Sequence, residues 1–159
     1  MYMPKAKKIA AGLIMYRMTS GAPEVFLVHP GGPFWKNKDA GTWSIPKGEA
    51  NEGENDLLAV AKREFKEEAG FDAIGDFKPL GTFEKPNKIV HVWAFEGDCD
   101  PSKLTSNTCM IEWPPKSGKQ LEIPEVDKGG FFSLEEAATK LMKYQVPVIG
   151  LFKEYLNGK

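Results

Sequence analysis

One segment of the sequence, residues 55–69, constrains the fold more than any other, because its apolar residues repeat with the period of an amphipathic helix. The repeating residues, spaced by three and four positions, are Leu58, Ala61, Phe65 and Ala69. Gly70 follows directly, at a position where helices commonly end in a left-handed residue. The pattern predicts a helix that packs one face on an apolar core.

Three carboxylates lie on the neighbouring arc of the same helix. At about 100° per residue, Glu64, Glu67 and Glu68 fall within an arc of about 100°. Like charges at these spacings destabilise a helix, and negative charge near its C-terminus opposes the helix dipole. A bound divalent cation would offset both effects, because hard cations such as Mg²⁺ take oxygen ligands. A solvated acidic face is the alternative for such a pattern taken alone.

The segments around this helix predict a mixed α/β fold. Short apolar runs bounded by turn residues predict strands at 9–16, 24–29, 77–84, 88–96 and 129–132. Further helices are predicted at 133–143, where Ser133 and Glu136 form a capping box, and at 147–156. Residues 97–124 are predicted to be one long irregular loop, and loops of that length are usually functional or mobile. Strands and helices that mix without strict alternation indicate a mixed sheet with helices packed on it.

Length and composition indicate a single globular domain over residues 1–159, with 42% hydrophobic and 27% charged residues. The formal net charge of −1 argues against an extended nucleic-acid surface, although residues 49–68 hold seven acidic and three basic side chains. We find neither a secretory signal nor an apolar run of the roughly 20 residues that a membrane span needs, so we expect a cytoplasmic protein without a membrane partner. Cys99 and Cys109 lack the spacing of a zinc site, and two free thiols are favoured over a single disulfide.

Residues 48–71 resemble the Nudix box, written G-x5-E-x7-R-E-U-x-E-E-x-G-U with U a bulky apolar residue. Gly48 and Glu54 match its first spacing. The second half matches in full, with Arg63, Glu64, Phe65, Glu67, Glu68, Gly70 and Phe71. Eight residues, rather than seven, separate Glu54 from Arg63, so the chain holds one insertion there and the role of Glu54 is left open. The segments around 30–35, 112–115 and 124–127 resemble a bacterial Nudix subgroup whose substrate is not well defined.

The resemblance implies a Nudix fold, a mixed β-sheet sandwiched between α-helices. It also implies a pyrophosphohydrolase that uses Mg²⁺, with Mn²⁺ as the alternative, to cleave a diphosphate linkage in a nucleoside diphosphate derivative. Dinucleoside polyphosphates and nucleoside triphosphates are the candidate small-molecule substrates. The alternative function is a nucleotide-binding regulatory module without turnover, and both a monomer and a homodimer stay open.

The resemblance assigns the catalytic residues to the box. Glu64, Glu67 and Glu68 are the implied metal ligands, with a water-orienting base as the alternative for Glu67 and the carbonyl of Lys47 as a further ligand. Arg63 is implied to orient a glutamate through a bidentate ion pair, with a direct phosphate contact as the alternative.

Outside the box, the candidate substrate-binding residues are less sharply defined. Phe34, Trp35 and Trp113 lie in segments rich in Pro and Gly and are candidates for stacking on a base. The Lys47 side chain is a candidate phosphate contact. Glu125 and Glu122 are candidates for the general base, and solvated carboxylates are the alternative for both. His29 is expected to be a buried sheet histidine.

Overall fold

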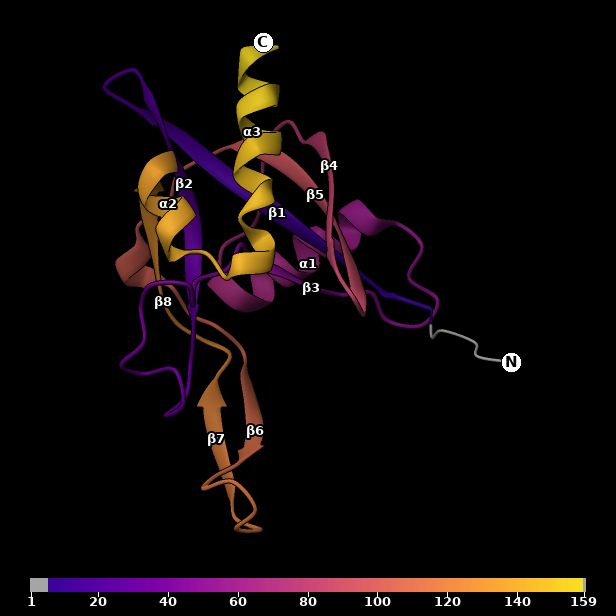
Figure 1. Cartoon of the computed structure of the whole chain (residues 1–159), viewed down its shortest axis with the longest axis vertical. Coiled ribbons are helices and arrows are strands. Elements are labelled where there is room, and N and C mark those ends of the chain that lie inside the picture. The colour runs from indigo at the N-terminus through magenta and orange to yellow at the C-terminus, as the bar shows by residue number, and fades with distance from the viewer. Residues whose placement is uncertain (1–5, 159) are drawn as a thin grey trace.

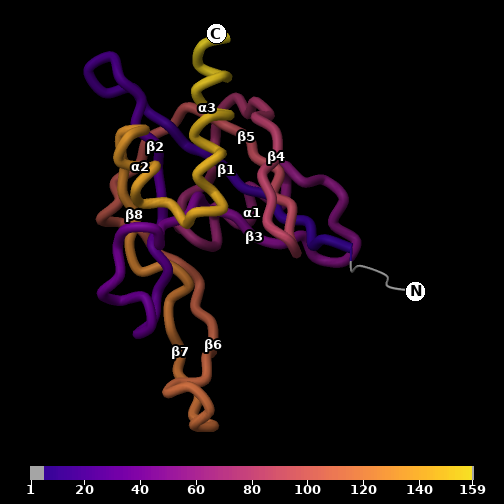
Figure 2. The backbone as a smooth tube through the Cα atoms, viewed as in Figure 1, coloured from indigo at the N-terminus to yellow at the C-terminus, as the bar shows by residue number. Residues whose placement is uncertain are grey.

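The computed structural model describes residues 6–158 and contains a mixed sheet with helices on both faces (Figure 1). Six strands form this sheet in the order β4-β5-β1-β2-β8, and β3 also pairs with β1. Two more strands, β6 and β7, form a separate hairpin that projects away from the sheet (Figure 2). The strands are β1 (Lys8–Thr19), β2 (Ala22–Pro30), β3 (Lys47–Glu49), β4 (Lys78–Lys85), β5 (Lys88–Glu96), β6 (Thr108–Glu112), β7 (Gln120–Pro124) and β8 (Val126–Ser133). The helices are α1 (Leu57–Ala69), α2 (Leu134–Lys140) and α3 (Pro147–Asn157), with short 3₁₀ segments at Pro101–Lys103 and Lys143–Gln145.

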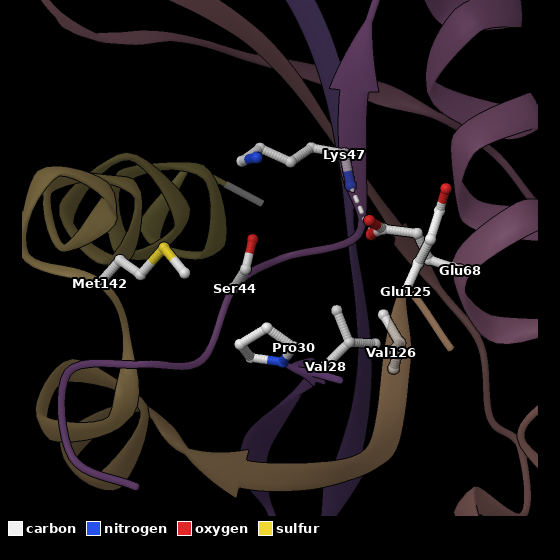
Figure 3. A pocket seen from close by; sticks show the side chains of 8 residues that line it. All are labelled: Val28, Pro30, Ser44, Lys47, Glu68, Glu125, Val126 and Met142. Atoms are coloured by element: carbon white, nitrogen blue, oxygen red, sulfur yellow. Dashed lines mark hydrogen bonds between the residues drawn. The ribbon is translucent and has the colours of Figure 1, made fainter. Parts of the chain in front are cut away.

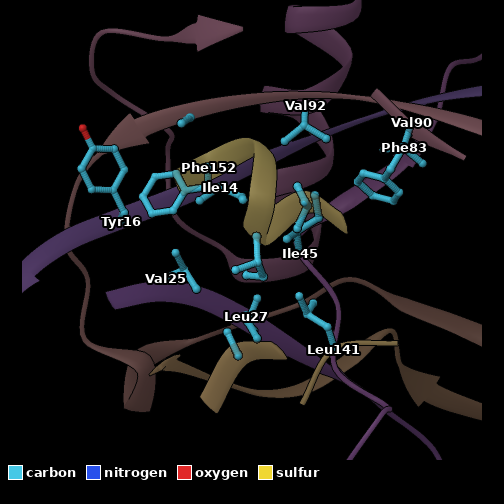
Figure 4. Packing of buried hydrophobic residues seen from close by; sticks show 14 of the residues in the cluster. Ile14, Tyr16, Val25, Leu27, Ile45, Phe83, Val90, Val92, Leu141 and Phe152 are labelled. Carbon is cyan, nitrogen blue, oxygen red and sulfur yellow. The ribbon is translucent and has the colours of Figure 1, made fainter. Parts of the chain in front are cut away.

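Strand β1 is the centre of the sheet and is buried on both faces, as a continuous apolar run predicts. Its side chains alternate between two clusters of buried residues. Ala10, Ile14 and Tyr16 belong to one cluster, shown in Figure 4, and Ala11, Leu13 and Met15 belong to the other. The period of two residues in a strand therefore divides the core into two layers.

A different helical layer covers each face of the sheet (Figure 1). Helix α1 packs Val60, Ala61, Phe65 and Ala69 into one cluster, and α2 and α3 pack against the other. The cap of α1 is as expected at its C-terminus, where Gly70 is left-handed with φ 82°. At its N-terminus the side chain of Asp56 accepts a hydrogen bond from the Ala59 N–H. The prediction of a mixed sheet sandwiched between helices is confirmed.

The edges of β1 are used unequally, and this opens the sheet beside α1. Its parallel neighbour β5 pairs along residues 8–16, whereas β2 pairs antiparallel only with residues 16–19. β3 takes the other part of that edge, opposite residues 10–12. Gly12 permits this approach, because a Cβ there would lie 2.8 Å from the Lys47 Cβ. As a result β2 and β3 diverge, and the segment that joins them bonds to the end of α2 and to the α2–α3 connection through Trp43 and Ile45.

Two predictions of local structure are wrong. Residues 97–124 are not one irregular loop, because they contain a 3₁₀ segment and the β6–β7 hairpin. The second helix ends at Lys140 rather than Lys143, since Leu141 adopts an extended conformation and its side chain is buried in the core. Ser133 caps this helix as expected, accepting from the Glu136 N–H.

Cys99 and Cys109 are both free thiols, as the sequence favours. No helix within residues 6–158 is long and apolar enough to span a membrane.

Candidate active site

A cavity of about 140 Å³ lies where β2 and β3 diverge, between the sheet and the C-terminal end of α1 (Figure 3). Its polar wall combines Lys47 from β3, Glu68 from α1 and Glu125 from the residue before β8. Apolar side chains and one hydroxyl form the rest of its lining, namely Val28, Pro30, Ser44, Val126 and Met142. Residues far apart in the sequence therefore meet at one hollow.

Glu68 is held against the strand by a main-chain hydrogen bond. Its Oε1 accepts from the Lys47 N–H at 3.1 Å, which Figure 3 shows as a dashed line. Glu64, one turn earlier, lies against Gly48, where an added Cβ would fall on its carboxylate. The glycine of β3 thus lets the carboxylate face of α1 approach the strand closely.

Arg63 connects the box carboxylates to the loop before the helix. Its Nε and Nη2 donate to the two carboxylate oxygens of Glu54 at 3.2 and 2.9 Å, in a bidentate pair. Its Nη1 donates to Glu64 at 2.9 Å and to Glu67 at 3.1 Å. The bidentate ion pair expected of Arg63 is present, and Glu54 is its partner despite the inserted residue.

The loop accommodates the insertion through a tight turn. The Asn51 N–H donates to the Glu54 side chain at 2.6 Å, and the Glu54 N–H donates to the Asn51 carbonyl at 3.0 Å. Gly53 has a φ of 86°, which a residue with a side chain rarely adopts. Because Glu54 lies in this turn and not on the helix, its side chain reaches Arg63 although one extra residue separates the two.

The site brings the carboxyl groups of Glu64, Glu68 and Glu125 together where burial removes part of their contact with water. Burial, with the charges of Glu64 and Glu125 adding to it, raises the pKa of Glu68 to about 8 even though Lys47 opposes the shift. Burial and the neighbouring Glu67 also raise the pKa of Glu64, which Arg63 partly offsets. The pKa of Glu125 rises for the same two reasons, burial and Glu67. Three carboxyl groups that each resist ionisation favour a site that binds positive charge.

Main-chain hydrogen bonds bring Glu125 to this cluster. The Asn107 N–H donates to the Glu67 carbonyl at the end of α1, and the Asn107 carbonyl accepts from the Glu125 N–H. On the other side, the Glu125 carbonyl accepts from the Gly31 N–H at 3.0 Å. Glu125 is therefore fixed between the end of the box helix and the loop after β2.

The donor set suits a hard divalent cation, since it consists of carboxylate oxygens whose charges are not fully compensated. Within residues 6–158, however, no three Asp, Glu, His or Cys side chains converge on one point as a preformed metal site. Arg63 accounts for part of this, because its Nη1 lies between Glu64 and Glu67. Binding of a cation by these carboxylates would require them to turn away from Arg63.

The other predicted site residues lie outside the cavity lining. Phe34 and Trp35 stack edge-on at 4.8 Å in the loop after β2, and Phe34 is 53% exposed. Trp113 follows β6 at the outer part of the hairpin, and Glu122 is exposed on β7 opposite Met110. Of the two candidate bases outside the box, Glu125 lines the cavity and Glu122 does not.

Sequence reasoning missed the residues that support the cavity wall from the α2–α3 connection. Gln145 is fully buried, and its carbonyl oxygen accepts from the Ile45 N–H at 3.1 Å while its amide donates to the Ser44 hydroxyl at 2.9 Å. Met142 lines the cavity beside Ser44. Gln145 lies between the two predicted C-terminal helices, where the sequence carries no pattern that indicates its partners.

Comparisons with known proteins identify the family and the fold of the chain. The NUDIX domain family matches residues 6–151. Among solved structures, a binary complex of Caenorhabditis elegans Ap4A hydrolase is 24% identical with a TM-score of 0.64, covering 96% of this chain and 99% of that one. The NUDIX domain of Shewanella oneidensis NrtR, complexed with ADP ribose, is 15% identical with a TM-score of 0.65, covering 98% and 94%. A MutT protein from Methanosarcina mazei is 20% identical with a TM-score of 0.62, covering 99% and 100%.

No curated protein matches the sequence significantly. At such identities the solved structures establish the fold, whereas the family match covers most of the sequence. The superfamily it points to is one of hydrolases of nucleotide derivatives. The matched residues include the whole of the box helix with Arg63, Glu64, Glu67 and Glu68, so the chain belongs to the Nudix domain family.

Proposed function

We propose that this chain is a Mg²⁺-dependent pyrophosphohydrolase that cleaves a diphosphate linkage in a nucleoside diphosphate derivative. The observation that carries the proposal is the convergence of Glu68, Glu125 and Lys47 on one cavity beside the remaining box carboxylates. Similarity to an Ap4A hydrolase and to a domain complexed with ADP ribose supports a nucleotide substrate with linked phosphates. Dinucleoside polyphosphates and nucleoside triphosphates are the first substrates to test.

Glu64, Glu67 and Glu68 would hold the cation, with the Lys47 carbonyl as a further ligand and Mn²⁺ as the alternative ion. When bound there, the cation neutralises anionic phosphate oxygens and polarises the P–O bond. Arg63 keeps its bidentate pair with Glu54 in this arrangement, which holds its guanidinium beside the carboxylates and limits the directions in which they can turn.

Glu125 is the proposed general base. Its carboxylate lines the cavity, and its raised pKa makes it a better proton acceptor than an exposed glutamate once it is ionised. It would take a proton from the attacking water, while the Lys47 ammonium meets a phosphate oxygen. The loop with Phe34 and Trp35 is the proposed contact for the base of the nucleotide, and Trp113 is a second candidate.

The test is turnover with a panel of dinucleoside polyphosphates, nucleoside triphosphates and nucleotide sugars, with and without Mg²⁺. Reaction in H₂¹⁸O followed by mass spectrometry of the products identifies the phosphorus that is attacked. We expect Glu68→Gln and Glu125→Gln each to lower kcat by about 10²-fold or more. Glu154→Gln, an exposed substitution on α3, is the matched control and should behave as the wild type.

Three results would contradict the proposal in different ways. Turnover without a divalent cation would reject the metal dependence. Full activity of Glu68→Gln would reject the role of that residue. Nucleotide binding without turnover on any substrate would favour the alternative function, a regulatory module.

A further inference from the structure

His29, near the end of β2, has both ring nitrogens in contact with other segments of the chain. The ring is fully buried. Its Nδ1 lies 2.8 Å from Oδ1 of Asp127, in β8, and its Nε2 lies 2.6 Å from the carbonyl oxygen of Lys38. One edge of the imidazole therefore faces the strand after Glu125, and the other faces the loop after β2.

Both of these partners are hydrogen-bond acceptors, and this restricts the protonation state of the ring. A neutral imidazole carries one N–H, so it would leave one nitrogen lone pair facing an oxygen lone pair. An imidazolium donates to both oxygens. The side chain of Asp127 is 30% exposed, whereas the imidazole is fully buried. The geometry therefore favours a buried ion pair.

Within residues 6–158, the hydrogen-bond partners of the ring are Asp127 and Lys38. Trp43 packs edge-on against it, with ring centroids 5.2 Å apart. The charged groups beyond Trp43 are already engaged: Asp39 accepts from the Trp43 Nε1 and from Lys140, and the Lys128 ammonium lies 5.7 Å from the Trp43 ring. Asp127 is thus the negative charge that contacts His29 directly.

The loop side of the contact organises the aromatic segment. The Lys38 N–H donates to the Trp35 carbonyl at 2.9 Å, and the Lys38 ammonium lies 3.6 Å from the centroid of the Phe34 ring. The carbonyl of the same lysine lies 2.6 Å from His29 Nε2, so the buried ring contacts the turn that carries the two aromatic side chains.

The strand side of the contact is next to the cavity. The register of β2 and β8 shifts between His29 and Pro30, which pair with Lys128 and Val126 respectively, so Asp127 is the extra residue of a β-bulge. Val126 and Glu125, immediately before it, line the cavity. A bulge commonly re-aims a side chain next to a functional site, and here it directs Asp127 at the imidazole.

We propose that His29, as an imidazolium, is a positioning residue that ties the loop carrying Phe34 and Trp35 to the strand entry that carries Glu125. The role in positioning substrate rests on the proposed function, whereas the doubly donating ring does not. Phe34 and Trp35 then meet the nucleotide from a loop anchored at a fixed place relative to the cavity.

The charge state is tested by long-range ¹H–¹⁵N NMR of the intact protein at pH 7.5, where a free imidazole is largely neutral. The chain has two histidines, so His91→Gln assigns the signals and His91 serves as the reference in the wild type. We expect both ring nitrogens of His29 to carry protons. In Asp127→Asn, an amide N–H can donate to Nδ1, so we expect the same ring to carry a proton only on Nε2. A singly protonated His29 in the wild type would overturn the proposal.

The positioning role is tested by amide hydrogen exchange of residues 34–39 and by kinetics. We expect Asp127→Ala to raise exchange of this segment about tenfold, whereas Asp127→Asn, which preserves a neutral hydrogen bond, stays within about twofold of wild type. Asp76→Asn removes an exposed carboxylate elsewhere and is the control for charge. Unchanged amide exchange of residues 34–39 in Asp127→Ala would overturn the positioning role of His29, even if the protein shows no turnover.

For a substrate that the wild type hydrolyses, Asp127→Ala should raise KM about fivefold or more and change kcat by less than about threefold. The Mg²⁺ concentration needed for activity should stay the same. Asp127→Asn should restore KM to near the wild-type value. An unchanged KM in Asp127→Ala would overturn the positioning role. If the wild type turns over no substrate, the proposed function is rejected. The NMR and exchange results then still decide whether His29 ties the loop to the strand.

Discussion

At the scale of single residues, the carboxylates of the site lower the stability of the folded protein, and a bound cation would offset this. Glu68 is half-buried beside other carboxylates, and its carboxylate accepts from one main-chain donor, the Lys47 N–H. Burying an ionised carboxylate without a full complement of partners destabilises the folded state. Functional sites commonly retain such groups at the expense of stability.

The first prediction concerns Glu68→Gln in the metal-free protein. Burial raises the pKa of Glu68 from its ordinary value of 4.5 to about 8, so folding takes up a proton between these values. The stabilisation from a neutral Glu68 is complete below the lower value and is lost as the pH rises through the upper one. In chelator, we expect the variant to exceed the wild type in free energy of unfolding at pH 8, and the difference to shrink toward pH 5.

Urea denaturation at several pH values measures this difference, which has a limiting slope of about 1.4 kcal/mol per pH unit. Glu154→Gln, on the exposed face of α3, should show no such slope. A constant difference between Glu68→Gln and the wild type across pH 5–8 would contradict the prediction.

At the scale of elements, the site depends on how closely β3 approaches α1. β3 is only three residues long, and its middle residue is Gly48, against which the Glu64 carboxylate lies. In the structure, the Nudix box therefore consists of a strand glycine, Gly48, and a helix face that carries three carboxylates. The turn at 51–54 joins the two and tolerates an extra residue, because Glu54 reaches Arg63 from the loop.

The second prediction follows from this contact. In Gly48→Ala the new Cβ would fall on the Glu64 carboxylate, which must turn away. Because that group is the end of a flexible side chain, we expect the fold to persist and the kcat/KM to fall about 10- to 100-fold. Gly150→Ala on α3 meets no atom within 4 Å and is the matched control. Circular dichroism and turnover of the two variants check the prediction, and wild-type activity of Gly48→Ala would contradict it.

At the scale of the whole molecule, stability is distributed unevenly. The six-stranded sheet has apolar clusters on both faces, whereas no residue of β6 or β7 is buried. The hairpin extends beyond the rest of the fold in Figure 1, and two-stranded hairpins are marginally stable in isolation. Glu125 nevertheless lies at its root, where it bonds to Asn107 before β6 and to Gly31 of the loop after β2.

The third prediction is that hydrogen exchange separates these two regions. We expect the amides of β6 and β7 to exchange at least about 100-fold faster than those of β1 and β5, because the hairpin can open without disrupting the core. Mass spectrometry of deuterated peptides at low protein concentration measures this. Equal protection of the hairpin and β5 would contradict the prediction.

Much of the fold was predictable because it is encoded locally. The helix 57–69 follows from apolar spacing and from its terminal glycine, and β1 follows from a continuous apolar run, since these patterns reflect burial of the same residues that form them. β3 could not be predicted, because Lys47, Gly48 and Glu49 carry no strand period and pair through the register of β1. The β6–β7 hairpin was missed for a related reason, as its alternating residues flank a long turn rich in Pro and Gly.

The candidate site divides in the same way. The spacing of Glu64, Glu67 and Glu68 along one helix sets their common face before any tertiary contact forms, and the box pattern identifies the family from these residues. Contacts between distant segments decide the rest. Glu54 pairs with Arg63, and His29 contacts Asp127. Glu125 lines the cavity, whereas Glu122 does not. Such contacts depend on strand register and loop path, which no local period encodes, because each partner's position is set by the packing of the whole sheet.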